Sequence, residues 1–480
     1  MVRVRFAPSP TGYLHVGGLR TALYNYLLAR HEGGQFILRI EDTDRTRLVE
    51  GAVDSLLDCL KWAGITPDEG AVVGGDCGPY VQSERLPIYH KMAQKLIDEG
   101  HAYYCFCTAE RLDQMRAEHS AKGESTAYDR RCRSVSKEEA AQRIANGEPY
   151  VIRLKVPDDR TLVVDDVVRG QVSFDSSLID DQVLIKTDGF PTYHMAVVVD
   201  DHMMGITHVI RGEEWLSSTP KHLLLYEFFG WEAPKFAHVP LIINESGKKL
   251  SKRDGDVSVE SYRAKGYLPE AMLNFLCLLG WNPGDEREFF TLDELCEAFT
   301  LERVRKSGAV FDFDKLRYIN GQHMRTKSAE ELADMALPFF DQLGKARPDR
   351  DYLIKVVELM AERATLLTDY VTEAPYLYED PSEYEEAAVK KRWKPVSGGL
   401  LSGLAEILAS DKVFDAESIE AALRVYAQDN GVGAGQLIHP MRLAISGCGT
   451  GPSLFHMAQL LGRETCLRRI EKAVKALPNG

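Results

Sequence analysis

The sequence predicts an α/β half that contains an insertion, followed by a half that is mainly helical. Three observations lead to this prediction. Near the N-terminus, a strand, a helix and a second strand follow one another at the spacing of a βαβ unit, which specifies a parallel sheet. A polar, charge-rich stretch over residues 110–149 interrupts the α/β pattern. From about Ser328 onward, apolar residues recur with the period of a helix.

The βαβ unit is defined by alternation, turn residues and helical periodicity. Its parts are a strand over residues 2–6, a turn over residues 7–12 with two prolines and a glycine, a helix from Gly17 to a glycine stop at residues 32–34, and a strand over residues 36–40. Parallel sheets bind ligands at the carboxyl ends of their strands. We therefore expect residues 7–18 and Glu41 to lie at a binding site.

The remaining elements follow in chain order. Strands are predicted over residues 150–156, 162–164, 196–199 and 208–211, and helices over residues 329–343, 351–370, 416–428 and 456–477. The strands 196–199 and 208–211 are interpreted as a return to the parallel sheet.

Composition limits the class of protein. The 480 residues carry 58 Lys and Arg against 72 Asp and Glu, a net charge of -14, and 44% are hydrophobic. These values exclude a wholly disordered chain and argue against a general nucleic-acid coat protein, while local basic patches remain available for RNA. No apolar run approaches the roughly 18 residues of a membrane span, and residues 1–6 do not resemble a targeting peptide. Nine cysteines, an odd number, do not suggest a disulfide framework, so we expect a cytoplasmic protein with no membrane partner.

Residues 8–18, Pro-Ser-Pro-Thr-Gly-Tyr-Leu-His-Val-Gly-Gly, predict a phosphate site. The turn lets the backbone approach a ligand, and the helix that starts at Gly17 and Gly18 directs free N–H groups and its positive dipole end toward that ligand. His15, just before the helix, can donate a hydrogen bond to a phosphoryl oxygen. A glycine-rich turn with a buried, hydrogen-bonded histidine is the alternative interpretation of the short His-x-Gly-Gly string; the complete segment favours the phosphate site.

This segment resembles the "HIGH" signature of the glutamyl and glutaminyl branch of class I aminoacyl-tRNA synthetases. Residues 248–253, Lys-Lys-Leu-Ser-Lys-Arg, resemble the second signature of that class, the "KMSKS" loop. Gly18 and Arg253 depart from the named signatures, as is common in the glutamyl branch. The resemblance to bacterial-type glutamyl-tRNA synthetases covers nearly the whole chain. It implies a Rossmann-type parallel-sheet catalytic domain with an inserted connective domain, followed by a mainly helical half.

The same resemblance implies ATP, as its Mg²⁺ complex, as a substrate. It assigns catalysis to His15, Lys249, Ser251 and Lys252, and ATP binding to Thr11, Gly17, Gly18, Glu214, Trp215, Lys249, Leu250 and Lys252. Lysines on a mobile loop can neutralise the charge that leaves with pyrophosphate. For residues 248–253 taken alone, a solvated basic loop is the alternative interpretation.

A glutamate substrate needs a guanidinium, which binds the side-chain carboxylate with a planar pair of donors. Arg5 and Arg211 are the candidates because both are predicted at strand ends, although Arg5 could equally be a solvent-facing strand residue. The resemblance adds Glu41 as an acceptor for the substrate ammonium, although Glu41 could equally help to cap the next helix. It also adds Ser9 and Tyr193 as neutral hydrogen-bonding groups.

Two groups of residues are candidates for binding a metal. Cys105, Cys107 and Cys132 would supply three of the four ligands of a tetrahedral zinc site, and the resemblance adds Tyr128 as the fourth. Three free cysteines in an apolar patch is the alternative. Residues 200–201, an Asp-Asp pair, could bind Mg²⁺ or end a strand, and the second interpretation is favoured.

Basic clusters in the second half suggest contacts with RNA. They comprise residues 303–306, Lys315, Arg317 and residues 390–394, where Trp393 could stack on an unpaired base. A solvated helix face is the alternative for each single cluster. The resemblance implies a catalytic domain over residues 1–104 and 191–256, an acceptor-binding insertion over 105–190, a stem-contact domain over 257–325 and a helical anticodon-binding region over 326–480.

The resemblance thus implies a monomeric glutamate–tRNA ligase whose partners are L-glutamate, ATP and tRNA(Glu). Whether tRNA(Gln) is also charged stays open; Arg363 lies in the region where the family reads the third anticodon base. Three other interpretations fit less well. A cytidylyltransferase-like enzyme has no use for the helical half, a silent tRNA-binding module would not need His15 and Lys249, and a truncated relative that modifies a tRNA base lacks the second half.

Overall fold

The computed structural model describes residues 1–251 and 255–478. The chain forms two compact units: the first comprises Met1–Tyr262 and Pro269–Phe313, and the second comprises Arg263–Leu268 and Asp314–Gly480. Across the described ranges, no helix is both long enough and apolar enough to cross a membrane. The finer division of the chain into domains stays a prediction.

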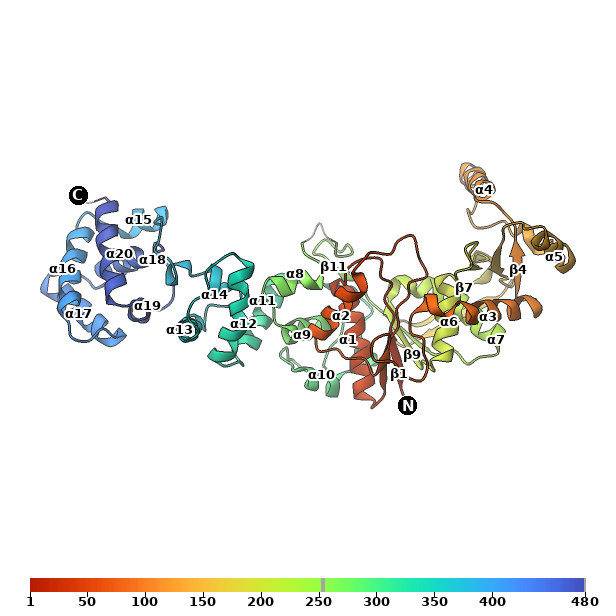
Figure 1. Cartoon of the computed structure of the whole chain (residues 1–480), viewed down its shortest axis with the longest axis horizontal. Coiled ribbons are helices and arrows are strands. Elements are labelled where there is room, and N and C mark those ends of the chain that lie inside the picture. The colour runs from red at the N-terminus through yellow and green to blue at the C-terminus, as the bar shows by residue number, and fades with distance from the viewer. Residues whose placement is uncertain (252–254, 479–480) are drawn as a thin grey trace. The chain divides into compact units, whose positions relative to one another are not determined.

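Helices and strands alternate along much of the first unit, as predicted for an α/β half (Figure 1). Before the insertion come β1 (Arg3–Phe6), α1 (Val16–His31), β2 (Gln35–Leu38), α2 (Ala52–Trp62), β3 (Glu69–Gly70) and α3 (Leu86–Asp98). The predicted insertion over residues 105–190 begins at the end of β4 (Ala102–Cys105) and contains α4 (Ala109–Lys122), α5 (Lys137–Ala145), β5 (Val151–Leu154), β6 (Thr161–Asp166), β7 (Gly170–Asp175) and β8 (Val183–Ile185). Then follow α6 (Tyr193–Met203), β9 (His208–Gly212), α7 (Thr219–Phe229), β10 (Lys235–Val239), β11 (Ile242–Ile243), α8 (Val259–Ala264), α9 (Pro269–Leu278), α10 (Leu292–Ala298) and β12 (Ala309–Val310).

The strands that carry the site are parallel. β1 pairs with β2 from Arg3↔Gln35 to Phe6↔Leu38, and β2 pairs with β3. β9 pairs with β10, and β10 with β6, also in parallel, while β6 and β7 form an antiparallel hairpin. The backbone N–H of Thr207, directly before β9, donates to the carbonyl of Arg3 (2.9 Å), so the two sheets meet at β1 and β9. Their carboxyl ends therefore share the edge at which parallel sheets bind ligands.

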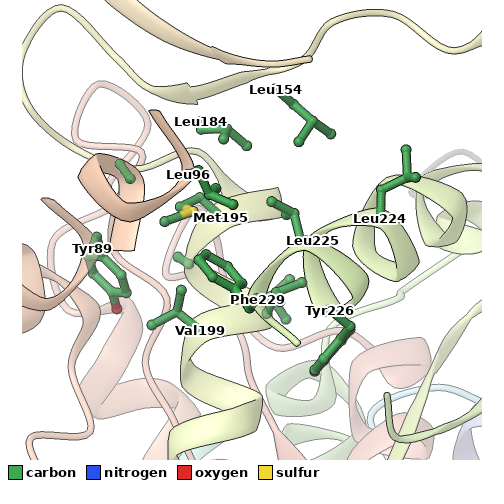
Figure 2. Close-up of a cluster of buried hydrophobic side chains, with 14 of the residues drawn as sticks. Tyr89, Leu96, Leu154, Leu184, Met195, Val199, Leu224, Leu225, Tyr226 and Phe229 are labelled. Atoms are coloured by element: carbon green, nitrogen blue, oxygen red, sulfur yellow. The ribbon is translucent and has the colours of Figure 1, made fainter. Parts of the chain in front are cut away.

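An apolar core joins the insertion to the parallel sheet. Figure 2 shows Leu96 of α3, Leu154 of β5, Val199 of α6 and Leu225 of α7 in one cluster, and all four side chains are fully buried. Burial of such a side chain stabilises the fold by about 1.5–3 kcal/mol relative to leaving it exposed. The core thus holds α6 and α7, which both carry residues of the site.

The prediction of a strand over residues 196–199 is wrong. These residues lie in α6, where every side chain from Met195 to Asp201 is buried. A short apolar run that is buried on all sides has the same pattern in a strand and in a helix. Packing against α3 and α7, which the sequence pattern does not reveal, decides for the helix.

The second unit is helical, as predicted. Its first helix, α11 (Phe313–Met324), begins at the boundary between the two units. The others are α12 (Ala329–Gln342), α13 (Arg350–Met360), α14 (Asp369–Thr372), α15 (Glu386–Arg392), α16 (Ser397–Ser410), α17 (Ala416–Asp429), α18 (Gly435–Ser446), α19 (Leu454–Leu461) and α20 (Arg463–Ala476). Towards the C-terminus α16, α17, α18 and α20 pack together (Figure 1).

Two helices predicted as continuous in this unit are broken. The helix over residues 351–370 stops at Met360, and the Asp369 carboxylate accepts the backbone N–H groups of Thr365 (2.7 Å) and Leu366 (2.9 Å), which satisfies these donors without helical bonds. The helix over residues 456–477 divides at Gly462, whose φ of 81° lies outside the helical region and favours glycine.

Candidate active site

A cleft of about 1060 Å³ opens where the carboxyl ends of β1 and β9 meet. It is lined by the turn after β1, the first turn of α1, the end of β9 and residues 249–251. Its lining includes the following predicted glutamate- and ATP-binding residues: Arg5, Ser9, Thr11, Gly17, Gly18, Glu41, Tyr193, Arg211, Glu214, Trp215, Lys249 and Leu250. The predicted catalytic residues His15 and Ser251 line it as well, whereas Lys252 lies outside the described residues.

His15 caps the N-terminus of α1 from within the cleft. Its Nδ1 atom accepts a hydrogen bond from the backbone N–H of Gly18 (3.0 Å), so the neutral ring carries its proton on Nε2 and can donate it to a ligand. Burial, together with the charge of Lys249, lowers the pKa of His15 below its ordinary value, which keeps the ring neutral at pH 7. The ring and the backbone approach closely here, because a Cβ atom at Gly17 would lie 3.2 Å from His15.

Lys249 reaches the same cleft from the hairpin that follows β11. The backbone N–H of Leu250 donates to the carbonyl of Ile242 (3.0 Å), which turns the chain back toward the cleft. The Lys249 ammonium lies 3.8 Å from the Glu214 carboxylate, and the two side chains are 64% and 44% exposed. An exposed pair at this distance is weak, so Lys249 can exchange Glu214 for a phosphate.

Two of the predicted glutamate-binding residues form buried ion pairs within the protein. Arg5 donates to Asp201 through Nε (2.9 Å) and Nη2 (3.3 Å). Glu41 accepts from Arg39 (2.9 Å), which also pairs with Asp201 (2.8 Å). Burial raises the pKa of Glu41, and Arg39 and Arg5 oppose that rise. Arg5 and Glu41 therefore line the cleft with charges that are largely compensated.

Asp200 and Asp201 lie within α6, so the favoured prediction that they end a strand is wrong. Asp200 accepts hydrogen bonds from Gln82 (2.9 Å), Arg85 (2.8 Å) and Tyr89 (2.8 Å). Asp201 is bound by the two arginines described above. Because both carboxylates are engaged by cations and by neutral donors, they do not fit a magnesium site either.

Arg211, at the end of β9, differs from these arginines because all its acceptors are neutral. Its side chain is 5% exposed, and within residues 1–251 and 255–478 no carboxylate pairs with it. The acceptors are His238 (3.0 Å), Tyr193 (2.8 Å), His222 (3.2 Å), Thr219 (2.9 Å) and the carbonyl of Trp215 (3.4 Å). A buried charge without a counter-ion is costly, so this site favours an anionic ligand.

Most of the residues around Arg211 were not predicted from the sequence, namely Thr219, His222, His238 and Asp166. One signal could have found His238: it lies near the end of β10, level with Arg211 on the neighbouring strand. The other three come from α7 and from the insertion, and no local pattern connects them with β9.

The insertion brings Cys105, Cys107, Tyr128 and Cys132 together, as predicted. The three sulfur atoms lie within 4.8 Å of one another. The Cys107 and Cys132 sulfurs are 3.6 Å apart, and the Tyr128 hydroxyl lies 3.4 Å from the sulfur of Cys105 and 3.5 Å from that of Cys107. Figure 1 shows β4, which ends at Cys105, beside the helices of the insertion.

Residues 1–318 match the family described as "tRNA synthetases class I (E and Q), catalytic domain". The chain belongs to this family. Residues 331–474 of this class I synthetase match an "Anticodon binding domain", in agreement with the helical second unit.

Curated relatives of this synthetase match it over its full length. The chain is 55% identical to a glutamate–tRNA ligase of Chloroherpeton thalassium and 50% identical to one of Chlorobaculum parvum, with 99% of this chain and 98% of each relative covered. Among solved structures it resembles a glutamate tRNA ligase of Elizabethkingia meningosepticum, in complex with its amino acid, with a TM-score of 0.92 and 41% identity over 99% of this chain and all of that chain.

In the second unit, the Trp393 ring fits neither of the two interpretations of its cluster, stacking on a base or a solvated helix face. The side chain is 6% exposed, and its Nε1–H donates to the carbonyl of Pro478 (3.1 Å), so the ring belongs to the core. Two cations of the predicted basic clusters form ion pairs with carboxylates. Arg317 pairs with Asp369 (3.1 Å) and Lys390 with Glu386.

Proposed function

We propose that this class I synthetase is a glutamate–tRNA ligase. It activates L-glutamate with ATP, as the Mg²⁺ complex, and transfers the glutamyl group from glutamyl-adenylate to the 3′ end of tRNA(Glu). The observation that carries the proposal is the position of Arg211, a buried guanidinium that has no counter-ion in the described part of the chain, in the same cleft as His15 and Lys249. A carboxylate and a triphosphate are the ligands whose charges match these groups. The full-length similarity to glutamate–tRNA ligases supports it.

Arg211 and Tyr193 select glutamate over glutamine in this proposal. Tyr193 accepts a hydrogen bond from Arg211, so its own hydroxyl proton stays available for a substrate oxygen. A carboxylate neutralises the buried guanidinium, whereas the amide of glutamine leaves the charge uncompensated and presents N–H groups to it. Glu41 and Ser9, on the same cleft wall, accept from the substrate ammonium and bind the substrate backbone.

The first step requires positioning and charge neutralisation but no covalent enzyme intermediate. An oxygen of the glutamate α-carboxylate attacks the α-phosphorus of ATP, and the bond to pyrophosphate breaks. The Nε2–H of His15 donates to a phosphoryl oxygen, Lys249 and Lys252 neutralise the charge of the leaving pyrophosphate, and the Ser251 hydroxyl donates a hydrogen bond to it. In the second step the terminal ribose hydroxyl of tRNA attacks the activated carbonyl and AMP leaves.

ATP–pyrophosphate exchange tests this proposal directly. We expect exchange that depends on glutamate, is not supported by glutamine, and requires tRNA. No exchange with either amino acid, with or without tRNA, would contradict the activity. Equal exchange without tRNA would contradict only the requirement for tRNA before the first step.

Recognition of the tRNA is assigned to the second unit. Burial raises the pKa of the Tyr376 hydroxyl to about 12, while the positive charges of Arg442 and Arg363 lower it. Arg363 is the residue that we propose to read the third anticodon base. Aminoacylation of purified tRNA(Glu) and tRNA(Gln), by the unmodified enzyme and by Arg363→Gln, measures whether the enzyme discriminates between them. Identical rates of both enzymes on both tRNAs would remove Arg363 from this role.

We also propose that the insertion binds zinc through Cys105, Cys107, Cys132 and Tyr128. A regular tetrahedron with Zn–S bonds of about 2.3 Å and a Zn–O bond of about 2.0 Å has S···S edges of about 3.8 Å and S···O edges of about 3.5 Å. The separations of 3.6, 3.4 and 3.5 Å given above fit these edges. The metal would be structural, because four protein ligands leave no open position.

Two arginines adjust the charge of this cluster. Arg111 donates to the Cys107 sulfur (3.6 Å), and the Arg153 guanidinium lies 4.0 Å from the centre of the Tyr128 ring.

Metal analysis of enzyme purified without chelators should give one zinc per chain, and Cys105→Ser should reduce that content while Cys296→Ser, outside the cluster, should not. Absence of zinc from the unmodified enzyme would end the proposal.

We further propose that the enzyme is a cytoplasmic monomer. Within the described residues, no cysteine forms a disulfide, which supports a reducing compartment. Sedimentation of the purified enzyme tests the oligomeric state.

A further inference from the structure

Arg211 is held by side chains from three different elements. Its Nε–H donates to His238 of β10, one Nη group donates to Tyr193 of α6 and to His222 of α7, and the other donates to Thr219 and to a carbonyl. Each of its three nitrogens thus donates to at least one acceptor, and each acceptor is uncharged. The guanidinium plane is therefore fixed in the protein before any ligand arrives.

The hydrogen bonds also determine the tautomers of the two histidines. His238 accepts from Arg211 at Nε2, so its proton must be on Nδ1, which lies 2.6 Å from the carboxylate of Asp166. His222 accepts from Arg211 at Nδ1, so its proton is on Nε2 and is donated to the Nδ1 of His194 (3.1 Å). Asp166, His222 and His238 are all almost completely buried, and burial lowers the pKa of both His222 and His238.

We propose that His238, oriented by Asp166, is a positioning residue for the binding of the glutamate side chain. This inference rests on the proposed function of Arg211. Asp166 keeps the proton of His238 on Nδ1. The unprotonated Nε2 of His238 then accepts the Nε–H of Arg211 without carrying a charge. Without that acceptor the guanidinium could rotate away from the substrate, and part of its binding energy would be spent on reordering it.

The pair also connects the insertion with the amino-acid pocket. Asp166 is the last residue of β6, which belongs to the insertion, while His238 and Arg211 lie opposite one another on the paired strands β10 and β9. A carboxylate of the insertion therefore acts on the substrate-binding arginine through a single histidine ring.

Asp166 has a structural role as well, so it is not the residue to replace. Its carboxylate accepts the backbone N–H groups of Val168 (3.0 Å) and Arg169 (2.8 Å), which organise the turn between β6 and β7. Its removal would disturb that turn and Arg211 together. His238 offers a cleaner test because two substitutions separate its two hydrogen bonds.

The experiment compares His238→Asn with His238→Gln. The asparagine amide reaches the position of Nδ1 but not that of Nε2, so it keeps a donor toward Asp166 and loses the acceptor for Arg211. The glutamine amide reaches the position of Nε2 and restores that acceptor. His202→Asn is the control, because His202 is in the same unit and stacks on Trp231 away from Arg211.

Pyrophosphate exchange in the presence of tRNA, with glutamate and ATP varied separately, gives the KM for each substrate. We expect His238→Asn to raise the KM for glutamate at least 10-fold and to change the KM for ATP less than twofold, while His238→Gln stays within about threefold for both. Equal values of the glutamate KM in the two variants, or equal changes of both KM values in His238→Asn, would overturn the inference. Loss of glutamate-dependent exchange in the unmodified enzyme would instead be a failure of the proposed function.

A measurement on the unmodified enzyme keeps the inference testable if His238→Asn does not fold. The ¹⁵N chemical shifts of His238 should report a neutral ring with its proton on Nδ1 at pH 7. A charged ring, or a proton on Nε2, would exclude the acceptor role and overturn the inference.

Discussion

Replacing Arg211 by glutamine removes the charge on which the proposed selection of glutamate depends. The substitution retains an amide that can still donate to part of the shell formed by His222, His238 and Thr219. It therefore tests the positive charge more than the hydrogen bonds. Arg160→Gln is the matched control, because Arg160 lies at the surface, where it pairs with Glu227 (2.9 Å) and is 42% exposed.

The expected fall in kcat/KM for glutamate follows from the burial of the Arg211 side chain. Two opposite unit charges about 4 Å apart interact with about 4 kcal/mol at an effective dielectric constant of about 20. The Arg211 side chain is 5% exposed, and no carboxylate of the described residues competes with the substrate for it. Since about 1.4 kcal/mol corresponds to a factor of ten, we expect kcat/KM for glutamate to fall about 10³-fold in Arg211→Gln.

The assay is aminoacylation of tRNA(Glu) with glutamate varied at saturating ATP. The control Arg160→Gln should stay within about twofold of the unmodified enzyme, because exposed ion pairs contribute only about 0–1 kcal/mol. A fall of less than about 10-fold in folded Arg211→Gln, judged by thermal unfolding, would refute the reasoning. In that case the charge of Arg211 would not be the main determinant of glutamate binding.

Three further predictions concern the rate, the pH dependence and the core. Lys249→Ala should lower kcat for pyrophosphate exchange by about 10²–10³-fold and leave the KM for glutamate within about threefold, because Lys249 acts on the leaving group; a changed glutamate KM with an unchanged kcat would contradict this role. Burial, with positive neighbours, lowers the pKa of His194 to about 3 and that of His222 well below its ordinary value, so below about pH 6.5 the unfolded chain binds protons that the folded chain does not. The free energy of unfolding should therefore fall as pH decreases from 6.5, by about 1.4 kcal/mol per pH unit for each histidine, and denaturant unfolding that is unchanged between pH 7.5 and 5.5 would disprove it. Leu225→Ala should cost about 2–5 kcal/mol in the same assay because Leu225 is fully buried, whereas Leu178→Ala, at a position that is 84% exposed, should change stability by less than about 0.5 kcal/mol; equal effects would contradict the assigned core.

The local motifs were predictable because their chemistry depends on neighbouring residues. A helix N-terminus that receives phosphate needs glycines and a capping side chain within a few positions, and residues 8–18 contain both. The cysteine cluster was found for a similar reason, since Cys105 and Cys107 are two residues apart and Cys132 lies within the charged stretch that follows them.

Predictions failed where burial, rather than pattern, decides the outcome. Residues 196–199 form part of a helix because neighbouring helices enclose them on all sides. Trp393 lies in a basic cluster of the sequence, yet its ring is buried and its indole N–H is bound by a backbone carbonyl. In both cases the residue type is compatible with two environments, and the sequence contains no local information on which one applies.

The amino-acid sequence by itself determined the α/β and helical halves and the turn at residues 8–18, whose residues line one cleft, because each depends on periodicity or on a short contiguous motif. Only the tertiary structure decided which arginine has a carboxylate partner within the described residues and which has neutral partners alone. Arg5 and Arg211 look equivalent in the sequence, but Asp201 neutralises Arg5 while neutral side chains from α6, α7 and β10 surround Arg211. The charge of a buried group depends on the partners that the fold brings to it from distant parts of the chain, and these partners have no fixed spacing along the sequence.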